Sequence, residues 1–190
     1  MEVHMVRKLQ VTAAVAVVAL LCTQAAFAQL GTTQDISASA NVYSAISLTG
    51  VTADVAFSNI QTNVNPFVDP TGAASTNVGT SAAAGTFTVN GSTGAAVQVT
   101  FSGQGTLTDG GANSMKFTPS VTVGATQGSS TSYTSGNSVT LTSGTAVFWV
   151  GGTLYATDGS SVVPSAQAAG SYSTGSAGGS AVTFTIDYVL

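Results

Sequence analysis

Short runs in which every second residue is apolar are the feature that most constrains how this chain folds. The clearest run is the last one, where one parity holds Val182, Phe184, Ile186, Tyr188 and Leu190 and the other is mostly polar. Shorter runs of the same kind cover residues 87–89, 97–101 and 139–142. Side chains alternate between the two faces of a β-strand, so a period of two predicts strands with one buried face.

No convincing helical period is present after residue 28, and glycines interrupt the alternating runs at intervals of about 8 to 12 residues. Residues 146–150 are apolar on both parities, which is typical of a strand covered on both faces. Residues 90–94, Asn-Gly-Ser-Thr-Gly, are predicted to form a hairpin turn. The 27 Thr and 24 Ser after residue 28 would suit a disordered linker, but their regular alternation with apolar residues argues against one. The pattern therefore predicts an all-β sandwich.

The first 28 residues are predicted to be a secretory signal peptide. Arg7 and Lys8 precede an apolar run over residues 11–22, and Ala26-Phe27-Ala28 provides the small residues of a cleavage site. This run is shorter than the about 20 apolar residues that a transmembrane helix needs. Two alternatives are an N-terminal amphipathic helix of the fold and lipidation at Cys22. A signal peptide predicts a secreted, extracellular or cell-surface protein with no membrane insertion after cleavage.

Reactive side chains are almost absent after this leader. Lys116 is the only basic residue beyond Lys8, and the only His, Cys and Glu are His4, Cys22 and Glu2. A catalytic triad needs a base, a zinc site needs thiolates or imidazoles, and a nucleic-acid groove needs clustered cations. The sequence therefore predicts no catalytic residues, no metal or other cofactor, and no nucleic-acid partner. So few charges also allow many copies to pack closely with little repulsion.

A long alternating segment follows the leader, after a short polar stretch at residues 29–35. Its apolar positions are Ile36, Ala38, Ala40, Val42, Ile46 and Leu48, with a break in parity at residues 43–45. One interpretation is an ordinary first strand of the sandwich. The other is a donor strand that completes the sheet of a neighbouring copy, with backbone pairing for affinity and apolar side chains in the acceptor's core. Donation would also cover an open sheet edge, which otherwise favours aggregation.

Several short motifs of the chain resemble one family. They lie at residues 55–60 (VAFSNI), 85–91 (GTFTVNG), 150–154 (VGGTL), 169–173 (AGSYS) and 182–188 (VTFTIDY). The chain resembles, in these motifs, the bacterial secreted domain of unknown function 4402, with Ser58 where that family usually has Gly. The resemblance implies an immunoglobulin-like or pilin-like β-sandwich, and the chain is also distantly similar to fimbrial and spore-coat-type subunits, which assemble by strand donation. Together with the alternating segment after the leader, this predicts a jelly-roll-like sandwich with an N-terminal extended strand. The resemblance also implies an extracellular or cell-surface location, and it supplies no catalytic residues.

Two acidic loops have both a metal-binding and a structural interpretation. Asp109-Gly110-Gly111 and Asp158-Gly159 resemble fragments of calcium loops. Calcium takes six to eight oxygen ligands, usually from several carboxylates, and each loop offers one carboxylate. Ordinary turn formation by Asp and Gly is therefore the favoured interpretation.

The single Lys and three of the aromatic residues also have two interpretations. Lys116 suits either a covalent crosslink to Asn or Asp, as in some pilin-like domains, or an outward position that discourages edge pairing. The outward position is favoured, because the six Asp residues after the leader are scattered and no Glu is present there. Trp149, Tyr155 and Tyr172 suit either sugar stacking or the core, and we expect them in the core.

The sequence thus predicts a structural subunit of an extracellular filament, assembled from identical copies by strand donation. The predicted organisation is a leader at 1–28, an extended segment at 29–48 and a sandwich at 49–190. The chain's partner is then itself, and a secretion or assembly chaperone is left open as a second partner. The alternative is a monomeric cell-surface adhesin or carbohydrate-binding module. Pairing of residues 29–48 within their own domain would favour that module.

Overall fold

The structure, a computed structural model, describes residues 42–101 and 103–189. The predicted leader at residues 1–28 and most of the predicted donor segment, residues 29–41, lie outside the described residues.

The described part of the chain is built from β-strands, which confirms the all-β prediction. The strands are β1 (Ser47–Ala53), β2 (Phe67–Val68), β3 (Gly85–Asn90), β4 (Ala96–Phe101), β5 (Gly105–Thr108), β6 (Ser114–Val123), β7 (Thr131–Tyr133), β8 (Ser138–Thr140), β9 (Thr145–Tyr155) and β10 (Phe184–Tyr188). A single 3₁₀ turn, Gln127–Ser129, lies between β6 and β7. No helix within the described ranges is long and apolar enough to cross a membrane.

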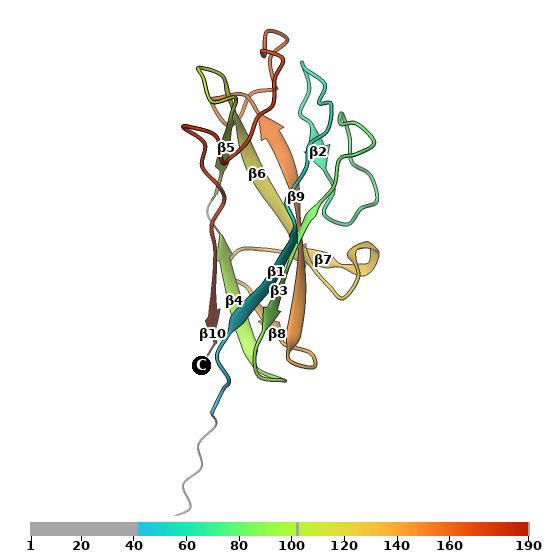
Figure 1. The fold of residues 1–190 in the computed structure, drawn as a ribbon. Helices are drawn as coiled ribbons and strands as arrows, with labels where there is room; N and C mark the ends of the chain where they lie inside the picture. Colours follow the sequence, from blue (N-terminus) through green and yellow to red (C-terminus); the bar gives the residue numbers. More distant parts are fainter. Residues whose placement is uncertain (1–41, 102, 190) are drawn as a thin grey trace, which may run out of the picture. The chain divides into compact units, whose positions relative to one another are not determined.

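Two antiparallel sheets of unequal size form the sandwich (Figure 1). The large sheet has the order β1-β3-β9-β6-β5, and the small sheet has the order β10-β4-β8. Strand β2 pairs with β9 beyond the end of β3, and β7 pairs with β6 beyond the end of β5. The large sheet is therefore five strands wide and faces a sheet that is three strands wide.

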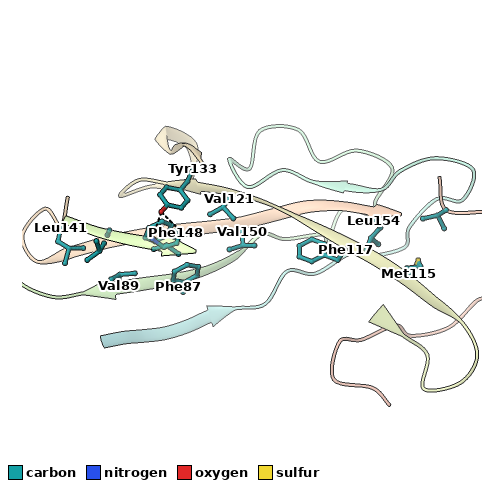
Figure 2. Close-up of a cluster of buried hydrophobic side chains, with 14 residues drawn as sticks. Phe87, Val89, Met115, Phe117, Val121, Tyr133, Leu141, Phe148, Val150 and Leu154 are labelled. Atoms are coloured by element: carbon teal, nitrogen blue, oxygen red, sulfur yellow. Dashed lines mark hydrogen bonds between the residues drawn. The ribbon is translucent and has the colours of Figure 1, made fainter. Parts of the chain in front are cut away.

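The core lies between the sheets and follows the two-residue period of the sequence (Figure 2). Val89 of β3 and Val97 and Val99 of β4 are fully buried, and their neighbours along each strand are only partly buried. Phe148 of β9 stacks on Phe87 at a centroid distance of 5.0 Å. These contacts confirm the strands predicted at 87–89 and 97–101 and the faces they bury.

The hairpin predicted at residues 90–94 is wrong. Strand β3 pairs with β1 and β9 in the large sheet, whereas β4 pairs with β10 and β8 in the small sheet. The Asn-Gly-Ser-Thr-Gly segment therefore carries the chain from one sheet to the other. A glycine-rich link between two alternating runs looks the same in sequence whether the strands pair side by side or stack face to face.

Lys116 points outward as predicted, but it does not protect a sheet edge. It lies in β6 between the buried Met115 and Phe117, and β6 is an inner strand that pairs with both β5 and β9. Its ammonium group donates a hydrogen bond to Thr106 Oγ1 across to β5, at 2.7 Å. The lysine therefore ties two neighbouring strands together on the outer face of the large sheet.

Candidate functional site

Strand β10 is the edge of the small sheet. Its five residues pair in register with β4, and no described strand pairs along its other edge. The side chains of Phe184, Ile186 and Tyr188 point toward the core but are only half-buried, whereas Val97 and Val99 of the neighbouring β4 are fully buried. The inner face of the sandwich is therefore incompletely covered beside β10.

Strand β1, the edge strand of the large sheet, is also incompletely covered on its inner face. Leu48 lies opposite Val89, so both side chains point to the same, inner face. Val89 is fully buried, but Leu48 is 54% exposed. The sandwich is thus open on the side where the edge strands β1 and β10 lie, and we call this side the open seam.

A cavity of about 360 Å³ lies at one end of the open seam. Its floor is the inner face of the large sheet, with Phe87, Phe117 and Val150. Its walls come from the segment that follows β1, including Phe57, from Leu107 of β5 and residues 172–174, and from the chain that leads into β10, including Val182 and Phe184. The lining is mostly apolar, with Asp54 as its one charged residue, so the cavity suits an uncharged aliphatic side chain.

The chain reaches the sandwich at the opposite end of β10 (Figure 1). The ring of Tyr43 stacks on the ring of Tyr188 at a centroid distance of 4.9 Å. The hydroxyl of Tyr188 donates to the carbonyl of Ser44, and the amide of Ser44 donates to Ser92 Oγ. Val42, one residue earlier, is 91% exposed. These contacts anchor the start of the described chain beside the end of β10.

The six residues of the predicted donor strand fall into three groups. Ile46 packs against its own core, and Leu48 pairs with Val89 of its own chain within β1. Val42 is exposed at the start of the described chain, and Ile36, Ala38 and Ala40 lie outside the described residues. The boundary predicted after residue 48 thus falls inside β1. At residues 47 and 48 the ordinary first-strand interpretation holds, because they pair with β3 of their own chain. Donation by the residues before β1 stays a prediction.

The two acidic loops form turns, as the favoured interpretation predicted. Asp109 Oδ1 accepts the amide of Gly111 at 2.8 Å, next to Gly110 with a positive φ of 81°. Asp158 accepts the amides of Ser160 and Ser161 at 2.9 and 2.8 Å, and also the hydroxyl of Ser161. The Ser161 hydroxyl and these two amides lower the pKa of Asp158 to about 2. Within residues 42–101 and 103–189, no three His, Cys, Asp or Glu side chains lie together as metal ligands would.

Two of the three aromatic residues expected in the core lie outside it. Tyr172 packs against the core as predicted. Trp149 and Tyr155 are half-buried on the outer face of β9, on the parity opposite to Phe148, Val150 and Leu154. The indole of Trp149 donates to the carbonyl of Gly124 at 3.1 Å, which fixes its ring. The prediction failed because the apolar run at 146–150 hides the parity that identifies a strand's inner face.

The open seam itself could not be predicted from the sequence, because alternation identifies the faces of β1 and β10 but not their neighbours. Comparison with known proteins adds no further information. No protein-family model matches the chain, and no curated protein sequence is significantly similar to it. The resemblance to the domain of unknown function 4402 therefore stays a prediction.

Proposed function

We propose that this protein is a secreted structural subunit that polymerises into an extracellular filament by donating an N-terminal strand to the next copy. The observation that carries the proposal is the open seam, where β10 has an edge unpaired by any described strand and inward side chains that are only partly buried. A free edge above an uncovered apolar face is what strand addition requires, because the incoming backbone completes the ladder and its side chains complete the core.

The segment before Val42 has the properties of such an incoming strand. Its apolar residues, Ile36, Ala38, Ala40 and Val42, share one parity, and Ser37, Ser39 and Asn41 share the other. Two alanines between two branched residues can enter a sandwich that already holds most of its core. Contacts with the home domain begin at Tyr43 and strand pairing begins at Ser47, so the proposed donor is limited to the residues up to Val42.

Arginine substitutions on the two faces of the segment test the proposal. We expect the double variant Ala38→Arg/Ala40→Arg to abolish filaments, because its charged side chains would have to enter an apolar core. The matched variant Ser37→Arg/Ser39→Arg carries the same added charge on the outward face, and we expect filaments of normal appearance. Electron microscopy of the secreted material and size-exclusion chromatography give the readout.

Equal assembly by both double variants would reject strand donation by this face. Absence of filaments from the wild-type protein would reject the filament itself. These substitutions are sharper than deletion of residues 29–44, because Tyr43 and Ser44 contact Tyr188 and Ser92 of their own domain. Unfolding in urea should give the same midpoint for the monomeric forms of both variants.

A second candidate function is that of a carbohydrate-binding module or adhesin, and Trp149 favours it. The indole lies on the outer face of β9 and is held by its bond to Gly124, so its ring is placed before any sugar arrives. Trp149 is the only tryptophan of the chain, so its fluorescence reports this site directly. A saturable change in tryptophan fluorescence on titration with oligosaccharides would support the module. Binding of the same oligosaccharides should be lost in Trp149→Phe, as measured by a binding assay that does not use fluorescence.

A further inference from the structure

We infer that the cavity at the open seam is the acceptor pocket for residues 36–42 of a second copy, which enter antiparallel to β10 and produce a head-to-tail polymer. This inference rests on the proposed function and adds to it the receiving site, the direction of the donated strand and the geometry of the polymer.

The position of the cavity identifies it as the receiving site. It is bounded by Ala53 at the end of β1 and by Phe184 at the start of β10, which are the two edge strands of the open seam. A strand added along the free edge of β10 would continue the small sheet toward β1 and pass directly over the cavity. Its inward side chains would then cover Leu48 and Ile186 and fill the space between Val182 and Phe57.

The end of β10 at which the chain reaches its own domain favours the antiparallel direction. Tyr43 contacts Tyr188, at the opposite end of β10 from the cavity. An antiparallel donor passes Tyr188 first and brings Val42 to the cavity, so the donor's own domain follows beyond the cavity end of the acceptor. Every copy then has the same orientation, and the contact repeats without closing.

The parallel direction has a different consequence. It would place Val42 beside the acceptor's Tyr188, so the two domains would meet through the same end. Two copies meeting through equivalent ends can exchange segments and close into a dimer, which leaves no free acceptor for a third copy. An open filament therefore goes with antiparallel entry.

Filling the cavity from within tests the acceptor pocket. We expect Val182→Trp to fold and to be secreted but to form no filaments, because the indole would occupy the space that the donated side chain needs. Val162→Trp is the matched control, since Val162 is 47% exposed and does not line the cavity. Filaments formed by Val182→Trp as readily as by Val162→Trp would overturn the acceptor assignment and leave the filament proposal intact.

Mixing two defective proteins separates the two halves of the contact. Val182→Trp keeps an intact donor segment, and Ala38→Arg/Ala40→Arg keeps an intact acceptor. Neither should polymerise alone, and the mixture should give a complex of one copy of each, seen by size-exclusion chromatography with light scattering. Two assembly-defective proteins that stay monomeric in the mixture would overturn the pairing of this segment with this cavity.

Cysteine pairs test the direction and do not depend on how Val182→Trp folds. In a Cys22→Ser background the chain has no other thiol. We expect Val182→Cys combined with Ala40→Cys or Val42→Cys to give a ladder of disulfide-linked multimers on non-reducing gels. A ladder only from Ile36→Cys would overturn the antiparallel direction. A disulfide found only within single chains would overturn donation between copies, and wild-type protein without filaments would reject the proposed function itself.

Discussion

At the scale of single residues, the hydroxyl of Tyr133 takes the place of a missing strand residue. Strand β8 pairs with Ala96–Gln98 of β4 and ends there, so Val99 is the next residue without a β8 partner. The amide of Val99 donates to Tyr133 Oη at 2.9 Å, and Tyr133 Oη lies at 2.9 Å from the carbonyl of Val99. The ring is 6% exposed and packs edge-on against Phe148 (Figure 2). One side chain thus joins the core to the small sheet.

Replacing this hydroxyl should destabilise the domain. We expect Tyr133→Phe to lower the free energy of unfolding by about 1–3 kcal/mol, because the buried amide of Val99 loses its acceptor while the ring packing is kept. Urea unfolding followed by circular dichroism gives the value. Tyr155→Phe, on the outer face of β9, serves as the control and should change the midpoint much less. Equal effects of the two substitutions would show that the hydroxyl of Tyr133 does not carry this stabilisation.

The acidic turns make a prediction about pH. The pKa of Asp158 is about 2 in the folded protein, mainly because the Ser161 hydroxyl and the amides of Ser160 and Ser161 stabilise its carboxylate. A lowered folded pKa stabilises the native state above the unfolded pKa of about 3.9, and this contribution is lost as the pH falls toward 2. Ser161→Ala should raise the pKa of Asp158 toward its ordinary value, as measured by NMR titration of its carboxyl carbon. An unchanged titration midpoint would contradict the assigned cause.

At the scale of strands, Gly151 and Gly152 allow the neighbouring strands to pack closely against β9. The φ of Gly152 is +147°, and a Cβ at this position would overlap the carbonyl oxygen of Thr118 on β6. A Cβ on the adjacent Gly151 would overlap the carbonyl oxygen of Val68 on β2. The Gly-Gly pair therefore lets β2 and β6 approach β9 closely, at the point where β2 takes over from β3 along its edge.

The sequence predicts strands better than it predicts sheets. The alternation of Phe87 with Val89, of Val97 with Val99 and of Phe184 with Ile186 identified three strands and their inner faces, because side chains report which face meets the core. Strand neighbours are set by backbone pairing, which leaves little trace in side-chain identity. The path at residues 90–94 and the open edge of β10 could not be predicted for that reason. Strand β2 is two residues long and has too few positions to show a period.

At the scale of the whole molecule, the unequal widths of the two sheets and the scarcity of charge both fit the proposed assembly by strand donation. A sheet of three strands cannot cover a sheet of five, so an apolar strip remains along the open seam. Surface charge would oppose close packing of many copies, but the whole chain carries three basic and seven acidic side chains. In the proposed filament, backbone pairing and apolar contacts are therefore the interactions that would join the copies.

The proposed mode of assembly predicts how a filament would respond to its solvent. Salt at 1 M reduces the Debye length to about 3 Å and weakens contacts that depend on exposed ion pairs. If strand donation joins the copies, we expect filaments to persist in 1 M NaCl and in EDTA, because backbone pairing and apolar contacts need neither ion pairs nor metal ions. They should dissociate only at denaturant concentrations that disrupt strand pairing. Sedimentation followed by electron microscopy measures the polymer that remains. Dissociation by salt alone would mean that the contact between copies depends on the few charged side chains. Dissociation by EDTA would mean that a metal ion completes the contact. Either result would contradict strand donation as the interaction that holds the filament together.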